Sequence, residues 1–373
     1  MKRLFSISLV VVLCFSLFAG CTNKTPTSQP TSDSSSDSSS DSATSEEKEV
    51  KEEKEIKDEK KEVKVSLVTD VSGINDQSFN QSSWEGMKCS EKDYGIKISY
   101  KESTQNADYI PNLNAMYDEK NDLIWGVGYM MSDAILEAAN TNPDQKFAIV
   151  DAGNWENTPS NLLGVTFKTE DAGFLVGYIA GKMTKTNKVG FLGGMSIPPL
   201  WQFECGYRAG VAYANPEVEV VIQYAESFTD VAKGKSVADG MFVQDVDIIF
   251  ACAGGLGDGV IEAAKESDKW VIGVDRDQNY MAPDNVLTSA MKRVDNAIYV
   301  VNKDLVDGKF EGGKTVVYGI KENAVGIAPT SSKNVPKDIL DAEAEIETKL
   351  VNGEISAPGN YKELDTFLSS IKK

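Results

Sequence analysis

Short apolar runs alternate with segments of helical periodicity along most of this chain, and this alternation restricts the possible folds more than any other feature. The runs lie at 65–68, 123–127, 147–150, 189–192, 218–222, 248–252 and 271–274. Apolar residues recur at helical spacing in 84–94, 132–139, 172–183, 207–214, 260–264 and 296–305. Strands that alternate with helices in this way predict parallel sheets of the α/β class.

The predicted strands fall into two groups, one before Asn161 and one after Lys185, which indicates two sheets and therefore two lobes. We expect the first lobe to contain 64–165 and about 291–308, and the second to contain 166–290 and about 309–373, with a ligand cleft between them. A strand at 315–318 and a helix at 339–351 suggest that the chain recrosses between the lobes. Ligands of open α/β sheets bind where strands run into helices, so we expect the binding residues at these connections.

The N-terminal segment has the features of a secretory signal. Lys2 and Arg3 precede an apolar stretch at 4–18 that is too short to span a membrane. Cys21 directly follows Ala19 and Gly20, which predicts a signal peptide at 1–20 and a lipid anchor on Cys21. The alternative is ordinary secretory cleavage with Cys21 incidental. Residues 21–63, rich in Ser and Asp and then in Lys and Glu, predict a flexible tether, although the part from Glu46 onward could also form a solvated helix.

The composition excludes several classes of function. The chain has no histidine, which removes Ser-His-Asp chemistry and most zinc sites. Cys89, Cys205 and Cys252 are an odd number without metal-ligand spacing, so neither a disulfide framework nor a metal site is expected. A net charge of −19 argues against nucleic acid as a partner.

The loop at 69–81 follows the first predicted strand and is the richest candidate for a binding site. Asp70 stands directly at the end of that strand, where a carboxylate is expected to contact a ligand. For Asp76, capping of the following helix is the favoured interpretation. Phe79 is either a ring at the edge of the cleft or a core residue.

Later loops add polar and aromatic candidates at other strand ends. Asp151 follows one strand, and Lys292 follows another and places a cation near the cleft, unless it is an ordinary surface lysine. The loop at 193–204 contains Trp201 and Phe203, which we expect to form one wall of a pocket.

The stretch at 252–259 resembles a dinucleotide-binding fingerprint, with Asp275 about 20 residues further on. The register fails because Val260 occupies the position of the required third glycine. A nicotinamide-dependent enzyme therefore remains only a minor alternative.

Several stretches, taken in order, together resemble one family. They are 70–80, 126–129, 173–178, 189–194 and 273–275. The family is that of the basic membrane lipoproteins, also called PnrA-like purine nucleoside receptors of ABC transporters. The resemblance covers essentially the whole globular part. It implies a type I periplasmic-binding-protein fold, with two doubly wound α/β lobes and a ligand cleft at the hinge, and it implies neither catalysis nor a cofactor.

The resemblance also implies roles for individual residues. Phe79 and Phe203 would sandwich the base of a nucleoside. Asp70 and Asn80 would hydrogen-bond the edge of the base, and Asp275 would bind the ribose hydroxyls.

Three further residues would complete the site: Gly254 through its backbone, and Asp151 and Lys292 through polar contacts. The implied partners are a small nucleoside and the permease and ATPase subunits of an importer. We expect a monomer anchored through Cys21 on the extracytoplasmic face of the cell membrane. The open alternatives are a sugar or autoinducer receptor of the same fold, and a surface adhesion or immune lipoprotein.

Overall fold

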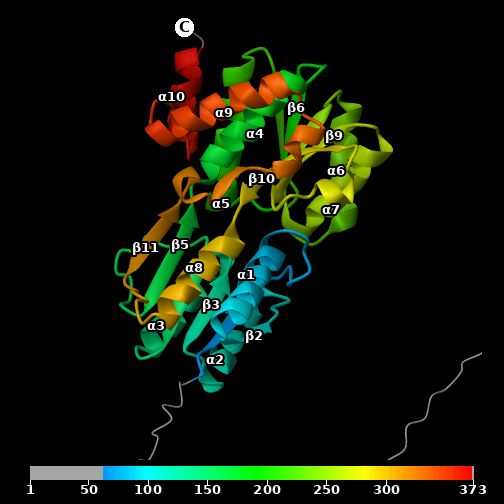
Figure 1. Ribbon diagram of the computed structural model, residues 1–373. Helices are drawn as coiled ribbons and strands as arrows, with labels where there is room; N and C mark the ends of the chain where they lie inside the picture. Colours follow the sequence, from blue (N-terminus) through cyan, green and yellow to red (C-terminus); the bar gives the residue numbers. More distant parts are fainter. Residues whose placement is uncertain (1–61, 372–373) are drawn as a thin grey trace, which may run out of the picture. The chain divides into compact units, whose positions relative to one another are not determined.

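The computed structural model describes residues 62–371, so the predicted signal peptide, the Cys21 anchor and nearly all of the predicted tether lie outside the described residues. The described chain forms two lobes, each built on a six-stranded sheet (Figure 1). The predicted α/β class with two largely parallel sheets is confirmed. None of the helices within 62–371 has the length and apolar character needed to cross a membrane.

The first sheet is entirely parallel and has the strand order β11-β5-β4-β3-β1-β2. Its strands are β1 (Lys64–Val68), β2 (Lys97–Lys101), β3 (Leu123–Val127), β4 (Lys146–Val150), β5 (Leu162–Phe167) and β11 (Lys314–Tyr318). Val68 pairs with Gly126, and Val127 pairs with Val150. The carboxyl ends of β1, β3 and β4 therefore meet at one edge of the sheet.

Helices cover both faces of the first sheet. They are α1 (Phe79–Tyr94), α2 (Tyr109–Asp118), α3 (Ser132–Thr141) and α8 (Val294–Val306). Trp125 packs in one cluster with Met87 of α1 and Ile298 of α8, whereas the neighbouring Ile124 packs with Ile135 of α3. Successive strand residues point to opposite faces, so a strand buried on both faces appears as a continuous apolar run.

The second sheet has the order β12-β10-β9-β8-β6-β7, and only β12 runs antiparallel. Its strands are β6 (Lys188–Gly193), β7 (Glu219–Tyr224), β8 (Ile248–Cys252), β9 (Trp270–Asp275), β10 (Val286–Lys292) and β12 (Val325–Ile327). The helices of this lobe are α4 (Thr169–Met183), α5 (Pro198–Ala214), α6 (Val231–Val243), α7 (Gly257–Glu266), α9 (Lys337–Asn352) and α10 (Tyr361–Ile371). Apolar residues of α9 and α10 pack on α4 and α5 as an additional outer layer.

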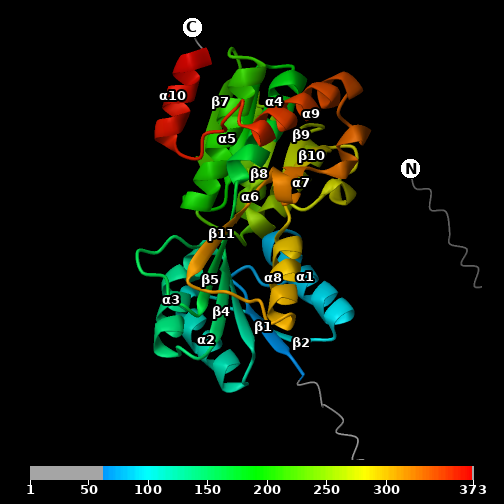
Figure 2. The same ribbon diagram turned by 60° about the vertical axis from the view of Figure 1, so that its left-hand side comes forward.

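The chain passes between the lobes three times among the described residues. It leaves the first lobe between β5 and α4, returns between β10 and α8, and leaves again between β11 and β12. Figure 2 shows β11 beside β5 in the lower lobe, although the two strands are far apart in the sequence. Because β11 pairs with β5, the prediction that 309–373 belongs as a whole to the second lobe was wrong for 314–318.

One predicted loop is largely helical. Residues 193–204 were expected to form a loop with two aromatic side chains, but α5 begins at Pro198 and includes both Trp201 and Phe203. Proline suits the first turn of a helix, where its missing N–H has no intrahelical partner. The two prolines therefore start the helix and do not extend the loop.

Candidate functional site

A cavity lies between the two lobes at the carboxyl ends of their strands. Its empty space, counting the part open to solvent, is about 590 Å³. First-lobe residues that line it are Asp70, Ser72, Asp76, Phe79, Asn80, Gly128, Tyr129, Met130 and Asp151. Second-lobe residues that line it are Ile197, Pro199, Leu200, Phe203, Phe228, Cys252, Ala253, Gly254, Val274, Asp275 and Lys292.

Asp76 caps the start of α1, which forms part of the first-lobe wall, the side of the cavity that the first-lobe residues line. Its carboxylate accepts hydrogen bonds from the backbone N–H groups of Ser78, Asn80 and Gln81, at 2.9–3.0 Å. These N–H groups belong to the start of α1 and have no intrahelical partners. The prediction that Asp76 caps this helix is therefore confirmed. The cap brings Phe79 and Asn80, the first two residues of α1, to the cavity.

Asp70 is a buried carboxyl group at the end of β1. Its Oδ1 accepts hydrogen bonds from the Ser72 N–H at 2.9 Å and from the Asn80 side-chain amide at 2.8 Å. Burial raises the pKa of Asp70 to about 6, although these hydrogen bonds oppose the rise. The buried Asn80 Oδ1 has no hydrogen-bond partner among the described residues, so an acceptor remains open at this wall.

Lys292 connects the hinge to the cavity. It ends β10, where the chain returns to the first lobe, and forms an ion pair with Asp151 at the end of β4. Its Nζ also lies 4.5 Å from the centre of the Phe79 ring and 5.2 Å from that of Phe167. Lys292 is only 2% exposed, so the alternative of a surface lysine was wrong.

Asp275 ends β9 on the opposite side of the cavity. Its carboxylate accepts a 2.5 Å hydrogen bond from the Ser78 hydroxyl of the first lobe. Burial raises the pKa of Asp275 to about 6, while the charge of Lys292 and the bond from Ser78 oppose the rise. Asp275 and Asp151 both have a positive φ, of 64° and 69° respectively. Such backbone is uncommon outside glycine, and aspartate tolerates it better than most residues.

The aromatic part of the second-lobe wall depends on close helix packing. Phe203 lies in the first turns of α5 and is buried against Phe250, with ring centres 5.8 Å apart. A Cβ on Gly173 of α4 would lie 2.5 Å from the carbonyl oxygen of Phe203. Only glycine at position 173 therefore allows α4 to pack this closely behind Phe203.

All eight predicted ligand-contact residues line this one cavity. Trp201, predicted as part of the same wall, is absent from its lining. Phe228, on the loop between β7 and α6, lines the cavity although it was not among the predicted residues. Its ring occupies space that a side chain at Gly194 would fill and lies beside Gly254. The sequence signal for Phe228 is the glycines that follow β6 and β8, Gly194 and Gly254, because they leave room for a large ring.

Two further features limit what this cavity can do chemically. Cys252 lies in the lining, but burial raises the pKa of its thiol well above the usual value, which keeps it protonated and a poor nucleophile. Within residues 62–371 no group of three or more acidic or cysteine side chains is placed to hold a metal ion. The arrangement suits reversible binding through aromatic contact and hydrogen bonds.

The fold and cavity define the class: a two-lobed α/β binding protein of the periplasmic-binding-protein type, with a small-molecule site between its lobes. Residues 63–361 match the family described as ABC transporter substrate-binding protein PnrA-like. The chain belongs to this family, whose members are solute-binding proteins and not enzymes. As a substrate-binding protein of an ABC transporter, it acts on the extracytoplasmic side of the membrane.

Individual relatives support this assignment. Basic membrane protein A of Borreliella burgdorferi is 42% identical over 312 residues, which cover 82% of this chain and 90% of that protein. A Lactococcus lactis protein named ABC transporter nucleoside-binding protein BmpA is 37% identical over 318 residues, covering 80% of this chain and 89% of that protein. The crystal structure of an ABC transporter solute-binding protein from Aeropyrum pernix superposes with a TM-score of 0.74 at 28% identity, covering 83% of this chain and 97% of that one.

Proposed function

We propose that this protein binds a purine nucleoside between its lobes and delivers it to the permease of an ABC importer. The observation that carries the proposal is the composition of the cavity. Each lobe contributes aromatic side chains, Phe79 from one and Phe203 and Phe228 from the other, and each contributes a buried carboxyl group. A planar, neutral ligand with hydroxyl groups matches this combination. The nucleoside-binding name of the Lactococcus lactis relative supports the same ligand class.

Each side chain has a role that follows from its chemistry. Phe79 and Phe203 would stack on the base, and each such contact is worth about 1–3 kcal/mol. Asp70 and Asn80 would hydrogen-bond the edge of the base, and the unpaired Asn80 Oδ1 would accept a hydrogen bond from it. Asp275 would accept hydrogen bonds from both ribose hydroxyls, because an ionised carboxylate has two acceptor oxygens.

The remaining contacts are polar or come from the backbone. Gly254 has a positive φ of 56° at the start of a short 3₁₀ turn, and its backbone would contact the ligand. Asp151 and Lys292, already paired with each other, would add polar contacts near the hinge.

Transport requires that the permease distinguish the loaded from the empty protein. Ligand contacts with both lobes would favour the closed arrangement, which the permease would recognise. Lipidation of Cys21 would keep the protein, as a monomer, at the outer face of the cell membrane. The 21–63 segment would then act as the tether between anchor and receptor.

Thermal unfolding of the purified protein against nucleosides, bases, sugars and amino acids tests the proposal. A ligand at 100 times its Kd stabilises the folded state by about 2.7 kcal/mol, enough for a measurable rise in Tm. We expect shifts with inosine, guanosine or adenosine and none with ribose. Shifts confined to sugars would instead identify a sugar receptor. The absence of any shift with small molecules would favour a macromolecular partner.

Substitutions within the cavity locate the binding site. We expect Phe79→Ala and Asp275→Asn to weaken nucleoside binding measured by calorimetry. Asp245→Asn is a matched control for Asp275→Asn, because Asp245 also has a positive φ, of 67°, but is exposed and outside the cavity. Equal losses in the two variants would mean that backbone conformation, and not ligand contact, explains the effect.

A further inference from the structure

The backbone at Asp275 is held in a tight turn that aligns its carboxylate with the cavity. The Arg276 N–H donates a 2.7 Å hydrogen bond to the carbonyl of Val274, closing a three-residue turn with Asp275 at its centre. A three-residue turn with a positive central φ, here 64°, is rare and strained. Strained backbone persists only where surrounding contacts hold it in place.

The next residue along the chain supplies such a contact from across the cleft. Arg276 Nη2 donates hydrogen bonds to both carboxylate oxygens of Glu85, at 2.9 and 3.0 Å. Glu85 lies on α1 of the first lobe, whereas Arg276 follows β9 of the second. Their side chains are 34% and 21% exposed, so the ion pair is partly shielded from water.

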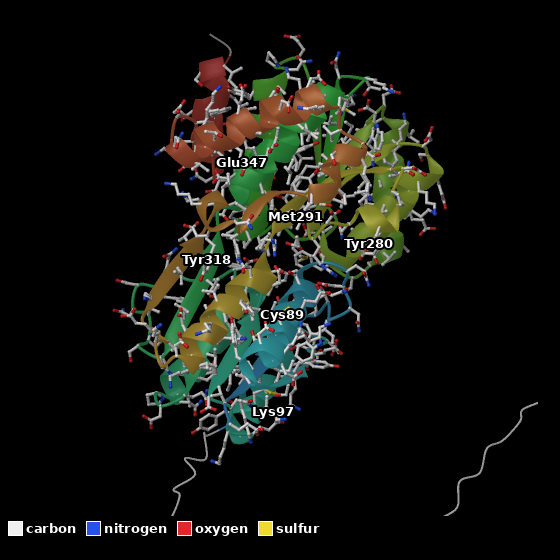
Figure 3. All side chains as sticks on the ribbon, viewed as in Figure 1. Cys89, Lys97, Tyr280, Met291, Tyr318 and Glu347 are labelled. Atoms are coloured by element: carbon white, nitrogen blue, oxygen red, sulfur yellow. The ribbon has the colours of Figure 1, made fainter. Side chains whose placement is uncertain are left out.

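Two further hydrogen bonds join the same two segments. The Tyr280 hydroxyl donates to Gln77 Oε1 at 2.6 Å, and Gln278 Nε2 donates to the Gln77 carbonyl at 3.2 Å. Gln278 Oε1 also accepts a 3.0 Å bond from the Val274 N–H, within the strand that leads into the turn. Figure 3 shows Tyr280 on the side of the second lobe that faces α1.

We infer that Arg276 and Glu85 are positioning residues, whose ion pair across the cleft holds Asp275 in its ligand-binding turn when the lobes close. The inference rests on the proposed function, since it concerns the same site. The partners belong to different lobes, so opening the cleft breaks the pair and leaves the turn supported only from within the second lobe, by the bond between Gln278 and Val274. Arg276 has no second ion pair among residues 62–371 that could replace Glu85. The complete ribose-binding arrangement therefore exists only in the closed form, and the pair retains a bound ligand by delaying reopening.

Glu85→Gln tests the inference because it removes the charge and keeps the shape of the side chain. We expect the Kd for inosine to rise about tenfold, mainly through faster dissociation measured by stopped flow. Arg276→Lys should weaken binding less, since a lysine keeps the charge but does not reproduce the hydrogen bonds of the guanidinium to both Glu85 oxygens. The charge-exchanged double variant Glu85→Arg/Arg276→Glu should recover much of the lost affinity.

Glu219→Gln is the matched control. It removes the 3.2 Å ion pair with Lys188, which joins two neighbouring strands inside the second lobe. We expect it to leave inosine dissociation unchanged. If Glu85→Gln also leaves the dissociation rate unchanged, the inference is wrong.

A measurement without ligand separates this inference from the proposed function. Spin labels on the exposed Cys89 of the first lobe and on Val243→Cys of the second, which is 86% exposed, report lobe separation once Cys14 and Cys21 are replaced by serine. We expect Glu85→Gln to shift the ligand-free distances to longer values, and Glu219→Gln not to. This result would support the pair even if wild-type protein binds no nucleoside. Unchanged ligand-free distances would overturn it, as would an unchanged dissociation rate.

Discussion

The two walls of the cavity are built in different ways. The first-lobe wall comes mostly from one loop and the start of one helix, where Asp70, Asp76, Phe79 and Asn80 hold one another through side-chain hydrogen bonds or the cap of α1. The second-lobe wall comes from separate places along the chain, including α5, the loop after β7, and the ends of β8 and β9. Local hydrogen bonds therefore define one wall, and tertiary packing defines the other.

The two walls should therefore tolerate different substitutions. Removing a polar side chain should disrupt the first wall, because side-chain hydrogen bonds of Asp70 and Asp76 hold it. Adding a small side chain should disrupt the second wall, because glycines allow its elements to approach one another.

Asp76→Ala should be the most damaging change to the first wall. It leaves three helix-terminal N–H groups without their acceptor, so we expect a loss of about 3 kcal/mol in the free energy of unfolding, measured with urea. Ligand affinity should fall as well, because Phe79 and Asn80 lose their support. Asp230→Ala is the control: Asp230 caps α6 in the second lobe through the Lys233 N–H, and its loss should leave affinity unchanged. Normal affinity in Asp76→Ala would mean that the first wall is held by packing after all.

Gly173→Ala should be the corresponding change behind the second wall. The added methyl group would lie 2.5 Å from the Phe203 carbonyl oxygen, which forces α4 and α5 apart. We expect a loss of about 2 kcal/mol in stability and weaker nucleoside binding. Gly240→Ala on α6 has nothing within 4 Å of its new methyl group and should stabilise the protein by up to about 1 kcal/mol. Similar behaviour of the two variants would contradict the role of close helix packing.

Phe228→Ala tests whether the second wall has an aromatic contact beyond Phe203. We expect a loss of about 1.5 kcal/mol in nucleoside binding, the typical value of one base–ring contact, measured by calorimetry. Phe367→Ala removes a half-buried ring of the same lobe outside this cavity. That control should lower stability but not affinity, and an affinity loss in both variants would refute a direct contact.

Lowering the pH should stabilise the ligand-free protein and weaken nucleoside binding, through one carboxyl group in each wall. Burial raises the pKa of Asp70 and of Asp275 to about 6, so the cost of their buried charge is present above pH 6 and is relieved as the pH falls toward 4. We expect the ligand-free protein to gain on the order of 1 kcal/mol per carboxyl group over this range. Nucleoside affinity should decrease over the same range because protonation removes an acceptor. Asp70→Asn and Asp275→Asn, titrated separately by calorimetry and urea unfolding, show which wall contributes. A pH dependence that survives both substitutions would exclude these two groups.

The fold was largely predictable because strands buried on both faces give continuous apolar runs. β2 was missed, since its sequence Lys-Ile-Ser-Tyr-Lys is that of a half-exposed edge strand without such a run. α6 was also missed, because Gly234 and Gly240 interrupt its helical pattern. The pairing of β11 with β5 depends on tertiary contacts that no local pattern encodes.

The site was predictable to the extent that its residues are neighbours in sequence or stand at strand ends. Asp70 could be placed from position alone, since it follows the first strand of a parallel sheet, whereas the binding role of Asp275 was predicted only through the family resemblance. The inclusion of Trp201 in the pocket was unsupported, because a helix turns successive side chains to different sides. Neither Phe228 nor the Arg276–Glu85 pair could be predicted, since both depend on how distant segments pack.

The repeated passage of the chain between the lobes has a consequence for how the protein is made. Synthesis delivers the first five strands of one sheet and then the first five strands of the other, but the sixth strand of each comes only at 314–318 and 325–327. Until then β5 and β10 each lack the neighbour that covers their outer edge, and contacts between such distant segments form slowly. A chain that stops before residue 314 therefore leaves both sheets incomplete rather than one lobe finished.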